Sequence, residues 1–181
     1  NIQILKPDIN KSYTKFTVDG DKIRFGLGSI KNVGTSAVDE IVAERDRNGQ
    51  FKDFTDFCER IQETNVNKKC IESLIKAGAF DEFNETRRTL MESFESILDT
   101  ITSSNKKELE GQVNMFDLGG SDSKEMKYTF KEFPEYSRKE LLFMEKEMLG
   151  LYISGHPLDN IRHQIEMQTN INSFQMRQME N

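Results

Sequence analysis

The chain lacks long apolar runs, and it holds only two cysteines and two histidines. A membrane-spanning helix needs about 20 consecutive apolar residues, so no span is expected. Cys58 and Cys70 stand far along the chain from His156 and His163, which leaves no zinc-type ligand spacing. We therefore expect two reduced structural thiols, as in a cytoplasmic protein, and neither a metal site nor another cofactor in this segment.

A secretion signal is also missing, because Asn1 to Asn10 have neither a basic start nor an apolar stretch. No initiator methionine opens the chain, so we expect it to be cut from a longer parent.

The chain has no excess of positive charge; its net charge is −6. Residues 1–90 hold 15 Lys and Arg against 15 Asp and Glu, whereas residues 91–181 hold 10 against 16. A DNA contact is therefore expected only in the first half. It should use local backbone geometry rather than a broad basic field.

Catalytic residues are not apparent either. The Asp and Glu side chains are scattered over solvated helix faces, without an isolated pair that would bind catalytic magnesium. His156 stands in a turn beside Pro157, where a structural role is expected. The sequence therefore predicts a binding segment that carries no catalytic residues.

The apolar pattern predicts a mainly α fold. Alternation over 16–25, around Asp19-Gly20-Asp21, predicts a small N-terminal β-hairpin. Helical spacing predicts helices over 36–47, 53–62, 67–77, 85–101 and 137–150. The residues expected to be buried on these helices are Ala37, Val38 and Ile41, then Phe54, Phe57, Cys58 and Ile61, then Ile71, Leu74 and Ile75, then Leu90, Phe94, Ile97, Leu98 and Ile101, and last Leu141, Met144, Met148 and Leu149.

Capping signals support these boundaries. Thr35 or Ser36 can cap the first helix, and Gly78 is expected to end the third. Ser137 and Glu140 form a capping box at the start of the last helix, with Tyr136 and Leu141 as a hydrophobic staple. Residues 151–153 then suggest a short strand or an extended piece, while 102–135 have the composition of a flexible linker.

Two glycine turns suggest DNA binding. In 27–37 an apolar residue, a tight turn and a capped amphipathic helix follow one another, as in a helix-hairpin-helix; a simple helical turn is the alternative. Gly34 lets backbone amides approach a phosphate, and a helix N-terminus favours an anion. A second such turn lies at Gly78. The expected DNA contacts are Lys31, Asn32, Val33, Gly34, Thr35, Ser36, Lys68, Lys69, Lys76, Gly78 and Ala79.

Three blocks in order resemble the bacterial DNA polymerase III alpha subunit family. They are Lys22-Ile23-Arg24-Phe25-Gly26-Leu27-Gly28-Ser29-Ile30-Lys31-Asn32-Val33-Gly34, then 66–81, then 139–158. The family's first hairpin usually carries Gly where this chain has Asn32, and Asn tolerates positive φ better than most residues. The resemblance implies a fragment of a DNA-directed DNA polymerase that binds duplex DNA non-specifically. The magnesium-binding aspartates of the parent would lie elsewhere.

An apolar pair interrupts the polar linker. Met115 and Phe116 could pack back on the domain or await a partner. The resemblance implies the second, because Gln112-Val113-Asn114-Met115-Phe116 is similar to the family's internal sliding-clamp-binding peptide. Gln112, Met115 and Phe116 would then be the clamp contacts. The implied partners are duplex DNA, the sliding clamp (beta subunit) and other holoenzyme subunits, without a membrane.

The implied organisation has four parts. Residues 1–27 would end a fingers region, 28–101 would be a tandem helix-hairpin-helix domain, and 102–135 would be the linker with the clamp motif. Residues 136–181 would hold a helix and the start of an OB-fold left incomplete at Asn181. The alternatives are a helix-hairpin-helix DNA-repair protein with a clamp-docking peptide, or a helical adaptor that binds only protein.

Overall fold

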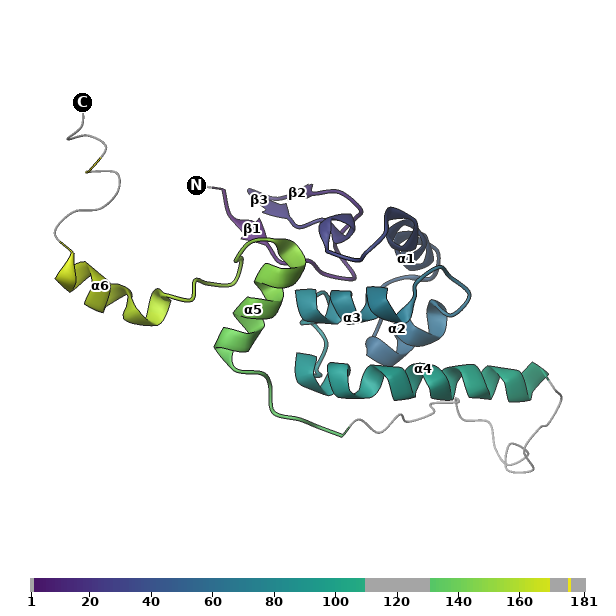
Figure 1. Ribbon diagram of the computed structural model, residues 1–181. Coiled ribbons are helices and arrows are strands. Elements are labelled where there is room, and N and C mark those ends of the chain that lie inside the picture. Colours follow the sequence, from purple (N-terminus) through teal and green to yellow (C-terminus); the bar gives the residue numbers. More distant parts are fainter. Residues whose placement is uncertain (1, 110–130, 170–175, 177–181) are drawn as a thin grey trace.

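The computed structural model describes residues 2–109, 131–169 and 176, with the backbone alone for 105–109. Within them the chain is mainly helical, with a small sheet near the N-terminus (Figure 1). The strands are β1 (Ile4–Leu5), β2 (Thr17–Asp19) and β3 (Lys22–Arg24). The helices are η1 (Leu27–Ser29), α1 (Thr35–Asn48), α2 (Phe54–Arg60), α3 (Lys68–Ala77), α4 (Arg87–Leu109), α5 (Arg138–Leu149), η2 (Asp159–Ile161) and α6 (Arg162–Gln168). The predicted mainly α fold is confirmed.

The small sheet has the strand order β1-β3-β2. The predicted hairpin is confirmed: β2 and β3 are antiparallel, Val18 is opposite Ile23, and Gly20 turns the chain at a φ of 63°. Strand β1 adds a parallel pairing of Ile4 with Ile23, which the sequence did not predict. A strand of two residues is too short to show the alternation of apolar and polar side chains by which a strand is recognised in a sequence.

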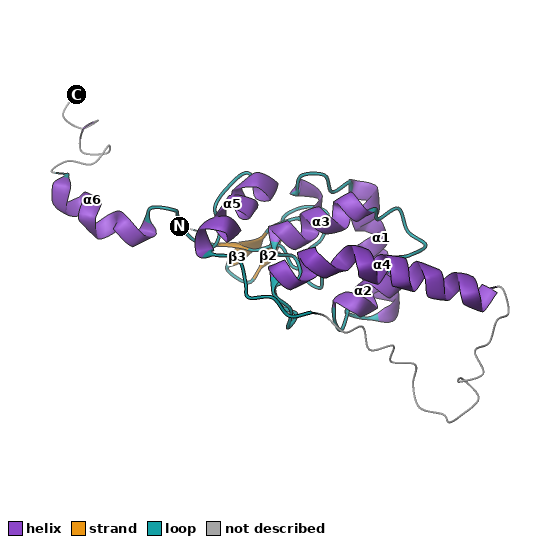
Figure 2. Cartoon of the chain, turned by 60° about the horizontal axis from the view of Figure 1, so that its bottom comes forward, coloured by secondary structure: helices purple, strands orange, loops and turns teal. Residues whose placement is uncertain are grey.

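The core lies between α1, α2, α3 and α4 (Figure 2). The predicted stripes of α1, α2 and α3 are all buried, and so are Leu90, Phe94, Ile97 and Ile101 of α4, whereas Leu98 is partly buried. Phe80, in the turn after α3, meets Phe54 and Phe57 edge to face, with ring centroids 5.0 and 4.9 Å apart. Such aromatic contacts add to the free energy of burial, so α2 is fixed against the turn that links α3 to α4.

The predicted caps are present except at α1: Gly78 ends α3 in the left-handed conformation, and Ser137 and Glu140 form the capping box of α5. Asn67, which was not predicted as a cap, accepts a hydrogen bond from the Cys70 amide at the start of α3. The prediction of Thr35 or Ser36 as the cap of α1 is wrong. Gly34 is the N-cap, without a side-chain hydrogen bond, because the helix begins one residue earlier than expected.

Helix α4 continues to Leu109, into the segment predicted as a linker. The polar side chains near its C-terminal end bond to the backbone of the same helix: the hydroxyls of Thr102 and Ser103 donate to the carbonyls of Leu98 and Asp99, four residues back. Serine and threonine make such bonds inside helices, so a polar stretch that resembles a linker in composition can remain helical.

Helix α5 packs on the same core as the preceding helices through Met148 and Leu149. This helix therefore packs with the segment before it, and the domain boundary expected at 136 stays a prediction. The buried face of α5 also differs from the predicted one: Leu142 and Glu145 are buried, whereas Leu141 is half-buried.

Of the two alternatives expected at 151–153, the described residues form no strand there, and the chain instead turns around a carboxylate. Glu145 accepts hydrogen bonds from the amides of Ile153 and Ser154, each at 3.1 Å. Helix α6 then extends away from the body and buries none of its residues (Figure 1).

Candidate nucleic-acid interface

The first hairpin runs from η1 through residues 30–34 into α1. Its first helix is a single 3₁₀ turn rather than the α-helix that the motif name suggests. Ile30 and Val33 are buried and anchor the turn, and the Val33 amide donates to the Ile30 carbonyl at 3.1 Å. The residues between and after these anchors, Lys31, Asn32 and Gly34, are exposed.

Asn32 takes the left-handed conformation that the sequence suggested, with a φ of 63°. Its side-chain amide donates to the hydroxyl of Ser73 on α3 at 3.3 Å. The amide of Lys31 donates to the carbonyl of Met148 at the end of α5 at 3.0 Å. The turn is therefore tied to two helices that lie far from it in sequence, and neither tie was predicted.

Gly34 has no structural need to be glycine. Its φ of −76° and ψ of 147° are extended backbone that any residue can adopt. A Cβ built on it would meet nothing within 4 Å. The absent side chain leaves open space on the outer surface, which is what an approaching phosphate requires.

Helix α1 presents free donors beside this space. No acceptor is found among the described residues for the amides of Thr35, Ser36 and Ala37. The first turn also carries no acidic residue, and Lys31 is exposed next to it. Unpaired amides and the positive end of the helix dipole favour an anion here. The structure thus brings Lys31, Gly34, Thr35 and Ser36 together on one surface, and their contact with DNA stays a prediction.

The second turn differs from the first, because the amides of Gly78 and Ala79 already donate hydrogen bonds within the protein. The amide of Gly78 donates to the carbonyls of Leu74 and Ile75, and that of Ala79 donates to Leu74. Ala79 is buried, and the Arg87 side chain lies where a Cβ of Gly78 would be. Gly78 and Ala79 are therefore structural residues and have no free amide to offer to a phosphate.

The N-terminus of α4 is occupied as well. The carboxylate of Glu135 accepts from the amides of Arg87 and Arg88, at 2.9 and 3.3 Å. Phe133 is fixed nearby, since its amide donates to the Thr89 hydroxyl at 2.9 Å. An internal anion thus fills the helix start at the second hairpin, unlike the first. No local sequence signal indicates this contact, because 48 residues separate Glu135 from Arg87.

The lysines expected around the second hairpin all have acidic partners. Lys68 pairs with Asp99 at 3.0 Å, and Glu72 binds both Lys69 and Lys76, at 2.7 and 2.6 Å. The hydrogen bonds from Lys69 and then Lys76 lower the pKa of Glu72.

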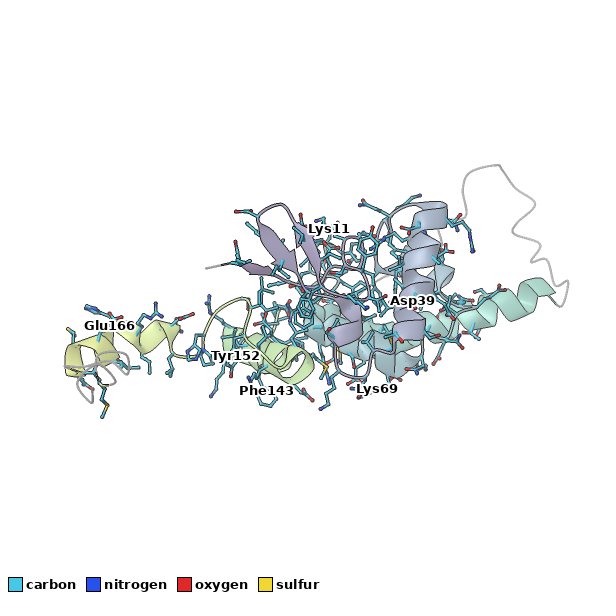
Figure 3. All side chains as sticks on the ribbon, turned by 90° about the horizontal axis from the view of Figure 1, so that it is seen from above. Lys11, Asp39, Lys69, Phe143, Tyr152 and Glu166 are labelled. Atoms are coloured by element: carbon cyan, nitrogen blue, oxygen red, sulfur yellow. The ribbon has the colours of Figure 1, made fainter. Side chains whose placement is uncertain are left out.

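The exposure of these lysines still differs. Lys68 and Lys69 keep side chains more than half exposed, whereas the Lys76 side chain is 22% exposed. Lys69 points outward near the start of α3 (Figure 3). Exposed ion pairs are weak, so Lys68 and Lys69 can exchange their partners for a phosphate, but Lys76 is a poor candidate.

Gln112, Met115 and Phe116 lie outside the described residues. In the described part of the chain, no group of three or more His, Cys, Asp or Glu could hold a metal ion. Nor is any of the described helices long and apolar enough to cross a membrane.

Residues 1–90 match the helix-hairpin-helix motif family. The chain is 40% identical over 172 residues to the DNA polymerase III subunit alpha of Borreliella burgdorferi, covering 94% of this chain and 15% of the relative. It is 44% identical over 162 residues to that of Deinococcus radiodurans, covering 88% of this chain and 12% of the relative. The subunit of Saccharopolyspora erythraea is 40% identical over 166 residues, covering 87% of this chain and 14% of the relative. The chain thus spans about 15% or less of the length of these relatives.

Proposed function

The chain belongs to the family of bacterial DNA polymerase III alpha subunits, and we propose that it is the duplex-holding segment of a DNA-directed DNA polymerase used in chromosomal replication. The parent would be the nucleotidyltransferase, with its magnesium ions bound outside this segment. The parent would work in the cytoplasm with the other subunits of the holoenzyme.

One observation carries the DNA-binding part of the proposal: the open surface at Gly34 lies beside the amides of Thr35 and Ser36, which have no acceptor among the described residues. A phosphate oxygen seated there would accept from these amides, with Lys31 adding a positive charge. Such a contact involves no base edge, so it would hold duplex DNA without sequence preference.

The proposed site is smaller than the sequence suggested. With Gly78, Ala79 and the α4 N-terminus engaged internally, the first hairpin supplies the main contact, and Lys68 and Lys69 supply exposed charge. Few phosphates would be touched, and each contact contributes about −0.9 to the slope of log K against log salt. The isolated segment should therefore bind weakly, in keeping with the neutral balance of residues 1–90.

We further propose that Gln112, Met115 and Phe116 bind the sliding clamp. The support is the match of Gln112-Val113-Asn114-Met115-Phe116 to the family's clamp-binding peptide. The clamp would keep the parent polymerase on its template, while the first hairpin holds the product duplex.

The DNA-binding proposal is tested with the 181-residue chain and two labelled duplexes of unrelated sequence, titrated at several salt concentrations. Lys31→Glu should weaken binding to both duplexes about tenfold and reduce the salt slope by about 1. Gly34→Val should weaken binding to both duplexes as well, because its side chain would fill the open surface.

The matched control is Lys52→Glu, which makes the same change of charge at another exposed lysine. Lys52 follows the C-terminal end of α1, a helix of 14 residues that is about 20 Å long, so it lies far from the first hairpin. The control should bind almost as well as the original chain. If Lys31→Glu and Gly34→Val bind no worse than this control, the first hairpin is not the contact.

A further inference from the structure

The first hairpin depends on an uncommon backbone conformation. Asn32 is the one non-glycine residue with a positive φ among the described residues. Asparagine tolerates this region better than most side chains, but the conformation remains strained relative to extended or helical backbone. A contact with a neighbouring residue must therefore hold Asn32 in the conformation that directs the free amides of α1 outward.

Ser73 is placed to do so. It lies on the inner face of α3 and is 1% exposed, between buried neighbours that include Leu74 and Ala77. A hydroxyl at such a position is costly to bury unless it is hydrogen-bonded, and an alanine would fit this helix better. The Ser73 hydroxyl accepts a hydrogen bond from the side-chain amide of Asn32, 41 residues away in sequence. The hydroxyl thus has a function that core packing alone does not explain.

The backbone on either side of Asn32 is fixed by hydrogen bonds that do not involve Ser73. The amide of Lys31 donates to Met148 and that of Val33 donates to Ile30, so the backbone on both sides of Asn32 is engaged. The amides of Thr35, Ser36 and Ala37, which follow Gly34, have no acceptor in the described part of the chain. Holding Asn32 therefore sets the direction of these donors relative to the Lys31 side chain.

We propose that Ser73 is a positioning residue of the phosphate-binding turn: its hydroxyl holds the Asn32 side chain, and with it the left-handed backbone that aims the free amides of α1 outward. This inference rests on the proposed DNA-binding function of the first hairpin. Ser73 is buried and does not touch the DNA. Its effect on binding is exerted through the order that it gives to the turn before DNA arrives, which reduces the cost of ordering on binding.

A double-mutant cycle tests the proposal, with Ser73→Ala, Asn32→Gly and the two together in the 181-residue chain. Ser73→Ala should weaken duplex binding about fivefold, the value expected for one lost hydrogen bond. Asn32→Gly removes the side chain that bonds to Ser73, and glycine enters the left-handed region without a supporting side chain. Ser73→Ala should then have no further effect on DNA affinity in the glycine background.

A third variant and a second measurement distinguish a positioning role of Ser73 from a general effect on the stability of the fold. Asn32→Ala has neither the freedom of glycine nor the amide group, and it should weaken binding at least as much as Ser73→Ala. Urea unfolding of each variant gives its free energy of unfolding, and binding is measured where every variant is folded. An equal loss of DNA affinity from Ser73→Ala in both backgrounds would overturn the proposal, since Ser73 would then act through packing.

The failure of this inference can be told apart from failure of the proposed function. If Lys31→Glu and Gly34→Val weaken binding but Ser73→Ala does not, Ser73 has no positioning role and the hairpin remains the contact. If none of the three weakens binding, the first hairpin does not bind DNA, and the inference fails with it.

Discussion

Arg87 binds both carboxylate oxygens of Asp81, through Nε and Nη2, each at 2.7 Å. Its remaining nitrogen donates to the carbonyl of Lys76 near the end of α3, at 3.0 Å. The Arg87 side chain is only 7% exposed. One guanidinium thus joins the end of α3, the turn after it and the start of α4, and it occupies the surface that the second hairpin would otherwise offer to DNA.

Gly78→Ala should strongly destabilise the fold. Gly78 has a φ of 79°, and a Cβ there would lie 2.1 Å from the Arg87 guanidinium. The strain and the displaced ion pair should lower the free energy of unfolding by about 2 kcal/mol. Urea unfolding followed by circular dichroism measures this change.

Gly34→Ala is the matched control, since that position has ordinary backbone angles and open space. The free energy of unfolding should change by less than about 0.5 kcal/mol, because a less favourable N-cap and a stiffer unfolded chain act in opposite directions. Equal losses in the two variants would show that Arg87 does not confine Gly78.

Acid should weaken the contact between Asp81 and Arg87. Burial raises the pKa of Asp81, but the hydrogen bonds and charges of Arg87 and Lys6 outweigh it, so the pKa lies below its ordinary value. A carboxyl with a lowered pKa in the folded state stabilises the fold above its unfolded pKa of about 3.9. This contribution is lost as the pH falls through the lower, folded pKa.

Asp81→Asn isolates this contribution. At pH 7 the variant should be less stable than the original chain, because Arg87 stays buried without a charged partner. The difference in the free energy of unfolding should narrow as the pH falls below about 4. A difference that stays constant from pH 7 to pH 2 would mean that folding does not lower the pKa of Asp81.

The helical part of the fold was predictable, because its signals are local. The stripe of Leu90, Phe94, Ile97 and Ile101 is set by the period of the helix, and the capping box of Ser137 and Glu140 joins residues only three apart. The extension of α4 beyond Ile101 was not predictable from composition. Its serines and threonines are typical of linkers, and only the helix itself supplies their acceptors.

The candidate site was predictable only in part. The sequence indicates the first hairpin, because glycine and a helix start stand together at Gly34. The supports of that hairpin, such as Ser73, come from distant segments and have no local signal. Another miss was avoidable: Glu72 and Lys76 stand four residues apart on one helix, a spacing that favours an ion pair. That pairing removes Lys76 from the exposed charges.

Both cysteine thiols should be inert in the folded chain. Burial raises the pKa of Cys70 to about 11 and raises that of Cys58 as well. Because the thiolate is the reactive form, a thiol reagent at pH 8 should label neither residue without opening of the core. Labelling rates followed by mass spectrometry test this, and the unstable Gly78→Ala variant should react faster. Rapid labelling of the original chain would show that these thiols are accessible.

Replacing Met115 and Phe116 by alanine should remove clamp binding. If both side chains enter an apolar pocket of the clamp, each contributes roughly 1.5–3 kcal/mol, from which the cost of ordering the peptide must be subtracted. The double variant should therefore lose at least about tenfold in affinity for the clamp of the same organism. Titration of the 181-residue chain against that clamp measures the change.

The control lies in the same peptide. Val113 and Asn114 stand at the two variable positions between Gln112 and Met115, so replacing both by alanine should leave clamp affinity almost unchanged. Duplex binding should be the same in all these variants, because the first hairpin is not altered. In the parent, even a micromolar contact would suffice, since a tether holds the polymerase at a high effective concentration beside the DNA. If the Met115 and Phe116 variant binds the clamp as tightly as the control, these two residues are not the tether.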